Sequence, residues 1–158
     1  MNKNYELKPI GKVIASNGNY SIHLEKEYLS GLTEIDGFSH LQVIWWGSMV
    51  DKPELRSVLV SKKPYKKGPE KIGVFATRSP VRPNPVLITN ISVLQIDHEK
   101  GIIHTPWIDA GNGTPVLDIK PYHLSERVKD CVVPDWCKHW PEWDEESGAF
   151  DWQNEFNF

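Results

Sequence analysis

Two loops hold most of the residues whose types and spacing could do chemistry. The first is RSPVRPNP at residues 78–85, where three prolines fix the backbone φ angle and remove amide donors. This stiffness lowers the entropy lost when Arg78, Arg82 and Asn84 are held in one arrangement. Because arginine presents a planar fork of N–H donors, the loop predicts a preorganised site for an anion or polar ligand. The alternative is a structural loop whose arginines pair with the protein's own carboxylates.

The second loop is DAGNGTP at residues 109–115. Asn112 and Gly113 favour positive φ angles and a tight turn, and glycines let a ligand approach the backbone closely. Asp109 and Asp118 bracket this turn. A carboxylate here could accept a hydrogen bond from a ribose hydroxyl, as acidic residues do in other nucleotide sites. The alternative is a plain hairpin turn in which Asp109 caps the backbone.

Strands are the elements that must position these loops. Strand-like runs separated by Gly, Pro and Asn occur at residues 9–14, 20–24, 40–49, 73–77, 86–97, 101–107 and 116–119. The run at 40–49 is too continuously apolar for a strand with one wet face, so we expect it inside the sheet. The runs at 86–97 and 101–107 flank a short polar turn ending in Gly101, which predicts a β-hairpin.

Many short strands and little helix predict an all-β fold. We expect a small closed or nearly closed antiparallel β-barrel, with one short helix at residues 25–32 and an irregular aromatic C-terminal tail. A β-sandwich is the competing architecture. The predicted domains are the barrel at residues 1–125 and a Trp- and acid-rich extension at 126–158, packed on the barrel or on a dimer partner.

Composition excludes several classes of protein. The 158 residues suit one domain, and a net charge of −3 argues against a generally basic surface that coats nucleic acid. The sequence shows neither the roughly 18 apolar residues that span a membrane nor a secretory signal, so we expect a cytoplasmic protein with no membrane partner. Cys131, Cys137 and His139 match no common zinc spacing, so we expect free thiols and no metal.

Residues 51–71 form a long connection that contains seven lysines and arginines. One interpretation is a solvated surface loop. The other is a contact with a phosphate backbone, because clustered basic side chains displace counterions from nucleic acid.

Longer motifs extend the pattern around both chemical loops. They are GVFATRSPVRPNP at residues 73–85 and GTPVLDIKPY at 113–122, preceded by IGKVI at 10–14 and GFSHL at 37–41. In order and spacing they resemble the TsaA-like (YaeB-like) proteins over roughly residues 8–122. The resemblance implies a β-barrel, typically a homodimer, that binds S-adenosylmethionine. It also implies methylation of the exocyclic amine of threonylcarbamoyladenosine, the modified adenosine beside the anticodon in threonine tRNA.

The resemblance also implies which residues form the site. By motif position, the cofactor would contact Arg78, Ile88, Asp109, Asn112, Gly113 and Thr114. Candidates for substrate binding are His40, Arg82 and Asn84, and no residue is assigned a catalytic step. Methyl transfer from a sulfonium is an in-line displacement that depends more on positioning than on strong acid–base help.

The sequence departs from the family pattern at three places. No Pro-Arg-Gln segment follows Ile14, a Phe-His pair is replaced by Gly47-Ser48, and the usual Asp-Gly-Thr-Pro begins with Asn112. The methyl acceptor is therefore left open between tRNA and a small molecule. A non-enzymatic module that binds a nucleotide-like ligand is a further alternative.

Overall fold

The computed structural model describes residues 5–157, which divide into two compact units. The first, which we call the sheet unit, comprises the described residues up to Val50 together with Pro85–Glu126. The second, the tail unit, comprises Asp51–Asn84 and the described residues from Arg127 onward. One junction thus lies a single residue from the predicted boundary at 125/126, although the predicted division into a barrel domain and an extension stays a prediction.

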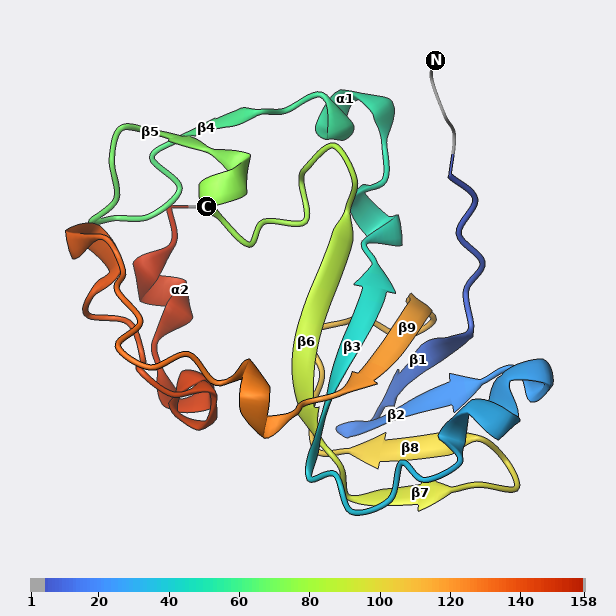
Figure 1. The fold of residues 1–158 in the computed structure, drawn as a ribbon. Helices are drawn as coiled ribbons and strands as arrows, with labels where there is room; N and C mark the ends of the chain where they lie inside the picture. The colour runs from blue at the N-terminus through green and yellow to red at the C-terminus, as the bar shows by residue number, and fades with distance from the viewer. Residues whose placement is uncertain (1–4, 158) are drawn as a thin grey trace. The chain divides into compact units, whose positions relative to one another are not determined.

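The sheet unit is built on a seven-stranded antiparallel sheet with the order β6-β3-β9-β1-β2-β8-β7 (Figure 1). Its strands are β1 (Gly11–Ser16), β2 (Asn19–Leu24), β3 (His40–Trp46), β6 (Val86–Ser92), β7 (Gln95–Asp97), β8 (Ile102–Thr105) and β9 (Pro115–Pro121). In the tail unit, β4 (Val60–Lys62) pairs with β5 (Lys71–Gly73). The prediction of a mostly β protein is confirmed.

Helices in the described chain are few and short. The α-helices are α1 (Pro53–Arg56) and α2 (Trp152–Glu155). The 3-10 helices are Lys26–Leu32, Ser48–Val50, Val74–Ala76, Leu124–Glu126, Asp135–Cys137 and Asp144–Ala149. The helix expected at residues 25–32 is present as the first of these 3-10 helices, and its Leu32 is buried. Within residues 5–157, no helix is long and apolar enough to cross a membrane.

Two tight turns follow from local sequence. Asn17 and Gly18 both have positive φ angles, 52° and 77°, which is the geometry of a two-residue hairpin turn between β1 and β2. The predicted hairpin at residues 86–107 is confirmed by the antiparallel pairing of β7 with β8. Its turn requires Gly101, which has φ +66° and where a Cβ would lie 2.1 Å from Leu29 Cδ2.

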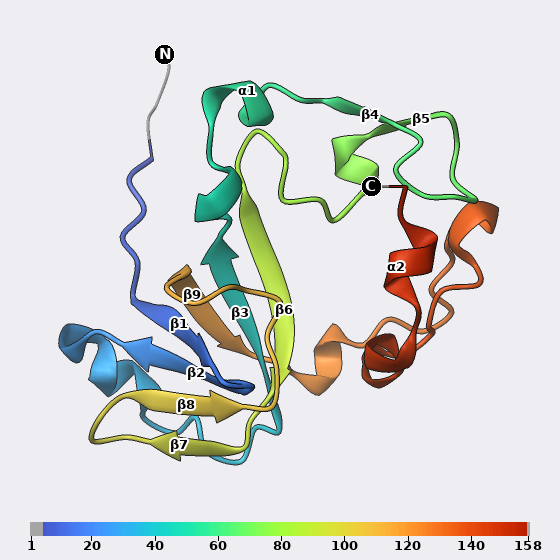
Figure 2. The same ribbon diagram turned by 180° about the vertical axis from the view of Figure 1, so that it is seen from behind.

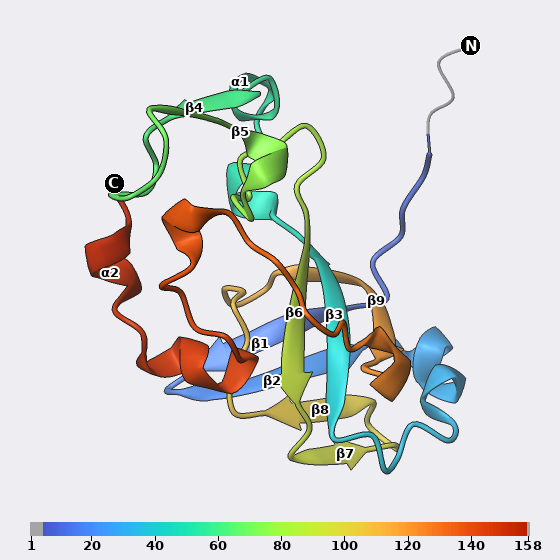
Figure 3. The same ribbon diagram turned by 60° about the vertical axis from the view of Figure 1, so that its left-hand side comes forward.

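The strand predicted at residues 86–97 is divided into two. Val93 and Leu94 separate β6 from β7, and these two strands stand at opposite ends of the hydrogen-bonded order. The Val93 N–H donates to Ser39 O (2.9 Å), on the β3 side, whereas the Leu94 N–H donates to His104 O (2.9 Å) on β8. One nearly continuous segment therefore supplies both ends of the sheet. Figure 2 shows β7 beside β8, and Figure 3 shows β6 beside β3.

The prediction of a strand at residues 73–77 is wrong. Gly73 ends β5, and Val74–Ala76 forms a 3-10 helix. The cause is local, because the Val74 carbonyl accepts hydrogen bonds from Thr77 Oγ1 (2.8 Å) and Arg82 Nη2 (3.0 Å). Side chains that bond to a nearby carbonyl offer the backbone an alternative to a strand ladder.

The core of the sheet unit is aliphatic and lies on one face of its strands. On β3, Leu41 and Val43 are buried, and this strand pairs with β6 on one side and β9 on the other, which confirms its expected place inside the sheet. The buried cluster consists of Val13, Ile22, Leu32, Leu41, Val43, Ile91, Ile103, Ile108 and Val116.

Candidate functional site

The loop at residues 109–114 is tied by hydrogen bonds to β1. The Ala15 N–H donates to Asn112 Oδ1 (3.0 Å), and the Gly113 N–H donates to Val13 O (2.8 Å). The Val13 N–H donates in turn to Thr114 O (2.9 Å), and Thr114 is buried. Gly113 has φ +80°, as the predicted turn requires. Asn112, Gly113 and Thr114 therefore hold the loop in a fixed shape.

Asp109 begins this loop and is exposed. Within the described chain its carboxylate makes no hydrogen bond and no ion pair, in contrast to Asp118, which pairs with Lys120 (2.7 Å). The hydrogen bond to Asp118 raises the pKa of Lys120. Of the two carboxylates that bracket the turn, Asp109 is the one available to a ligand.

The segment after β3 lies beside the same loop. A Cβ on Gly111 would meet the sulfur of Met49 at 3.6 Å, and Met49 is 80% exposed. The Gly47 N–H donates to Pro85 O (2.8 Å), and a Cβ on Gly47 would lie 3.0 Å from Leu87 Cδ1. A bulky side chain at residue 47 would press on the start of β6, which gives a structural reason for glycine at this departure from the family pattern.

Ile88 and His40 lie on the neighbouring strands β6 and β3. Ile88, 47% exposed, pairs with Ile44, whereas His40 pairs with Ser92 four residues further along β6. Four residues of strand correspond to about 13 Å. Both ring nitrogens of His40 contact hydroxyls, Ser39 Oγ at 2.9 Å and Ser92 Oγ at 3.1 Å. His40 thus lies at the opposite end of β3 from the Asp109 loop, and its substrate role stays a prediction.

The octet at residues 78–85 belongs to the tail unit, apart from Pro85. Within it, Arg82 binds its own loop: Nε donates to Ser79 O (2.8 Å), and Nη2 donates to Thr77 O (2.7 Å) as well as to Val74 O. These hydrogen bonds add to the stiffness that the prolines predict. Their acceptors are backbone carbonyls of the same loop rather than carboxylates. Arg78 is exposed. The ligand roles of Arg78 and Arg82, and the pairing of Arg78 with Asp109 in one pocket, stay predictions.

Arg56 lies at the end of α1, and in the sequence it is one of the seven basic residues of the connection at 51–71. Its Nε donates to Pro83 O (2.7 Å), its Nη2 to Asn84 Oδ1 (3.2 Å) and its Nη1 to Asp51 Oδ1 (3.3 Å). It thereby holds Asn84 from the side. The sequence feature that could have indicated this role is that Arg56 is the one arginine among the lysines of residues 51–71. A planar fork can bind several oxygens at once, which an ammonium group does less well.

The remainder of the tail unit is an aromatic cluster. The ring of Tyr65 lies 5.2 Å from Trp136, 5.0 Å from Trp140 and 5.8 Å from Phe156, measured between centroids. Burial raises the pKa of Tyr65. The aromatic rings of the C-terminal segment pack on residues 51–84 through Tyr65. Packing on the barrel or on a dimer partner stays a prediction.

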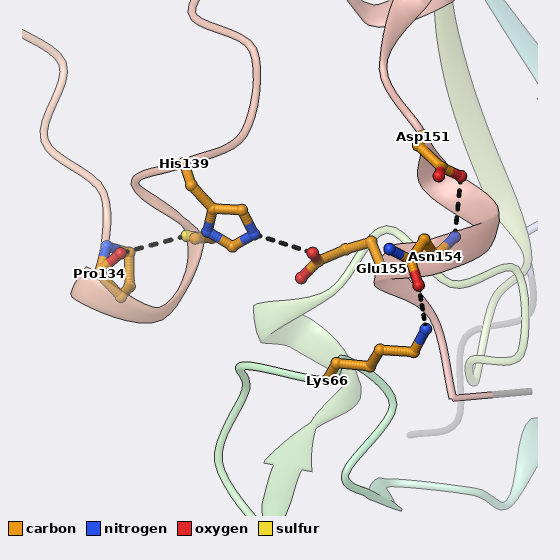
Figure 4. A network of polar contacts seen from close by, with 7 residues as sticks. Lys66, Pro134, His139, Asp151, Asn154 and Glu155 are labelled. Carbon is orange, nitrogen blue, oxygen red and sulfur yellow. Dashed lines mark hydrogen bonds and ion pairs between the residues drawn. The ribbon is translucent and has the colours of Figure 1, made fainter.

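A buried carboxylate lies within this cluster (Figure 4). Glu155 is 6% exposed and accepts a hydrogen bond from His139 Nε2 (2.8 Å). Burial is the largest influence and works against the charged form, but the interactions with His139, Trp140 and Lys67 together outweigh it and hold the pKa of Glu155 below its usual value. Lys66 donates through its backbone N–H to Glu155 O (2.9 Å) and through Nζ to Asn154 Oδ1 (2.6 Å).

The two cysteines are free thiols, as expected. Cys131 is exposed, and Cys137 is buried, which raises the pKa of its thiol. Among the residues that the structure describes, no group of three or more His, Cys, Asp or Glu side chains could hold a metal ion.

Comparisons with known proteins assign the chain to a family. A model of the tRNA-methyltransferase O N-terminal domain matches residues 3–126. An S-adenosyl-L-methionine-binding protein of Archaeoglobus fulgidus is 34% identical over 140 residues, covering 80% of this chain and 93% of the relative. A tRNA (adenine(37)-N6)-methyltransferase of Eikenella corrodens is 50% identical over 56 residues, covering 35% of this chain and 32% of that protein.

A solved structure shares the fold. The crystal structure of TrmO from Pseudomonas aeruginosa matches with a TM-score of 0.61 at 22% identity, covering 82% of this chain and 61% of that chain. The chain thus spans about three fifths of the solved chain that it matches. The sheet and the solved match define a protein with the fold of that solved chain. More specifically, the chain belongs to the tRNA-methyltransferase O family through its N-terminal domain, which confirms the family that the paired motifs predicted.

Proposed function

We propose that this protein is an S-adenosylmethionine-dependent methyltransferase. The observation that carries the proposal is the family match over residues 3–126, which includes the fixed loop that begins at Asp109. The relative from Archaeoglobus fulgidus, named for binding S-adenosyl-L-methionine, supports the choice of cofactor. When bound, the cofactor supplies an electrophilic methyl group on a sulfonium.

The residues of the loop fit a nucleoside with a ribose and an apolar face. Asp109 offers an exposed carboxylate that can accept a hydrogen bond from a ribose hydroxyl. Gly111 and Gly113 leave the backbone open to close approach, and Met49 and Ile88 add exposed apolar surface. Arg78 would hold a carboxylate through its fork of donors. The task of these side chains is to orient donor and acceptor, because an in-line displacement depends chiefly on alignment.

The proposed acceptor is the exocyclic amine of a modified adenosine, threonylcarbamoyladenosine, beside the anticodon of tRNA. Two features support this choice: the family to which the chain belongs, and the 50% identity over 56 residues to a protein named for methylating adenine 37 of tRNA. His40, Arg82 and Asn84 are the proposed substrate-binding residues. We place the reaction in the cytoplasm, where tRNA is processed.

The proposal includes a barrel and a homodimer. Only Val93 and Leu94 separate β6 from β7 in the chain, yet β6 pairs with β3 and β7 pairs with β8. The strands β3, β9, β1, β2 and β8 therefore connect β6 to β7 through the sheet. That arrangement supports a sheet that closes on itself through the bend at these two residues. A sedimentation experiment at several concentrations tests the dimer.

Calorimetric titration of the protein with S-adenosylmethionine tests the cofactor assignment. We expect Asp109→Asn to weaken binding at least tenfold and Arg78→Ala to abolish it, while Glu99→Gln, an exposed carboxylate in another turn, leaves it unchanged. Transfer of a labelled methyl group to bulk tRNA, compared with a pool of small metabolites, then tests the acceptor. Absence of cofactor binding by the unaltered protein would overturn the proposal, and label found only in metabolites would overturn the tRNA assignment.

A further inference from the structure

The segment Asp51–Asn84 leaves and re-enters the sheet unit at its two ends, and Arg56 joins those ends. One terminal nitrogen of its guanidinium reaches Asp51, the first residue of the segment, and the other reaches Asn84, the last. The Nε atom holds the carbonyl of Pro83, at 2.7 Å the shortest of the three contacts. A single side chain therefore fixes both the backbone and the side chain at the end of the proline-rich loop.

The contact determines how the amide of Asn84 is turned. A guanidinium has only donors, so it must face the carbonyl oxygen of the amide and cannot face its amino group. The amino group of Asn84 consequently points away from Arg56. In the described part of the chain it donates to no protein acceptor, and Asn84 is exposed.

The backbone on either side removes the remaining freedom. Pro83 has a fixed φ, and Pro85 restricts Asn84 to extended geometry. Asn84 is thus locked in backbone and in side chain, with two N–H donors presented to solvent. An amide that could flip would serve a donor or an acceptor equally well, whereas this one turns its amino group, which can only donate, toward solvent.

We propose that Asn84 recognises a hydrogen-bond acceptor on the methyl acceptor, such as a carbonyl or carboxylate oxygen, and that Arg56 is the positioning residue that fixes this preference. The inference rests on the proposed function and deepens it, because it states the chemistry that the substrate must present. A site built to donate to an oxygen discriminates against an analogue that lacks that oxygen, because its donors are then left unpaired.

The variant Asn84→Asp separates this role from a structural one. It keeps an oxygen opposite Arg56 and strengthens that contact, but it replaces the donating amino group by a second acceptor. If Asn84 only braces the loop, the variant should be as stable and as active as the parent. We expect instead an unchanged or raised thermal midpoint, unchanged calorimetric affinity for S-adenosylmethionine, and at least a tenfold lower kcat/KM with bulk tRNA, chiefly through KM.

Substitutions of Arg56 supply the second test. Arg56→Lys still offers only donors and should retain more activity than Arg56→Met, which leaves the Asn84 amide free to turn. Lys129→Met removes an exposed positive charge from another segment of the tail unit and is the matched control. Equal KM values for tRNA in the Lys and Met variants would contradict the positioning role.

Binding of bulk tRNA, followed by fluorescence anisotropy at two salt concentrations, makes the test independent of turnover. Repulsion between a new carboxylate and phosphate is screened by salt, whereas the loss of a short-range donor is not. We expect the weaker binding of Asn84→Asp to persist at the higher salt concentration. Parental affinity in this variant would overturn the inference. An inactive parent protein that does not bind S-adenosylmethionine would instead overturn the proposed function, so the two failures are distinguishable.

Discussion

The sheet unit and the tail unit are held together by different interactions. In the sheet unit, buried aliphatic side chains such as Ile22 and Ile103 pack on a ladder of antiparallel strands. In the tail unit, aromatic rings surround Tyr65, and a buried Glu155 pairs with His139 among few regular elements. Apolar burial is insensitive to pH, whereas the carboxylate of Glu155 titrates with a lowered pKa. The two units should therefore respond differently to substitution and to acid.

The largest effect is expected in the aliphatic core. Ile103→Ala removes a side chain with no exposed surface and should destabilise the protein by about 4 kcal/mol, because it leaves a cavity in addition to the lost burial. Chemical denaturation measures the free energy of unfolding. The control is Leu94→Ala, at a side chain that is 66% exposed, with a change of about 0.5 kcal/mol or less. Equal effects of the two substitutions would contradict the assigned core.

The next effect tests the close approach of β1 and β2. A Cβ on Gly11 would lie 2.3 Å from the backbone carbonyl oxygen of His23, and a backbone atom cannot turn aside. Gly11→Ala should cost about 3 kcal/mol and reduce hydrogen-exchange protection in peptides from both strands. Gly31→Ala, where no atom lies within 4 Å, is the matched control and should be near neutral. Retained protection in β1 would contradict the predicted clash.

A smaller effect is expected at the buried carboxylate of the tail unit. Glu155→Gln removes the charge that accepts from His139 and should cost about 2 kcal/mol at neutral pH. Because folding lowers the pKa of Glu155, its contribution is fully present above the usual value of 4.5 and is lost as the pH falls through the lower folded value.

Hydrogen exchange in peptides from residues 135–157 should therefore rise at acid pH in the parent protein, and less steeply in Glu155→Gln. The same peptides in Glu142→Gln, an exposed carboxylate, serve as the reference. Identical acid profiles for the parent and the Glu155 variant would show that this pair does not govern the pH response of the unit.

The smallest effect concerns α2. Asp151 caps this helix by accepting a hydrogen bond from the Asn154 N–H (3.0 Å; Figure 4). Asp151→Ala should cost about 1 kcal/mol, whereas Asp151→Asn should be nearly neutral, because asparagine caps helices equally well. Thermal denaturation compares the two variants. A loss of the same size in both would mean that charge, rather than the cap, determines the effect.

The sequence predicted the sheet unit better than the tail unit. Alternating and continuous apolar runs located β2, β3, β8 and β9 to within about three residues, because period-two patterning reflects burial directly. The same pattern could not divide residues 86–97, since the division depends on which neighbours accept the N–H groups of Val93 and Leu94. The strand expected at 73–77 failed for a similar reason, because the carbonyl of Val74 is taken by side chains nearby.

The candidate site shows the same limit. Motifs predict site roles for Asp109, Asn112 and Asn84, but nothing local to Asn84 indicates that Arg56, 28 residues earlier, turns its amide. The aromatic composition of residues 126–158 predicted packing on the barrel or on a dimer partner, whereas the contacts seen within the tail unit join residues as distant as Lys63 and Asn157. Side-chain contacts across such separations are decided by the folded chain and are not encoded in periodicity.

The tail unit is made of two segments far apart in the sequence, and this has a consequence for folding during synthesis. Its segment Asp51–Asn84 leaves the ribosome well before residues 127–157, yet Lys63 O accepts a hydrogen bond from Asn157 Nδ2, 94 residues later. Contacts of such high order form slowly, because the intervening chain must first be ordered. The loop that contains Arg78 and Asn84 belongs to this unit, so it is synthesised before the aromatic residues that complete the unit. Chaperones and proteases would therefore have access to this loop on the nascent chain before the tail unit has folded.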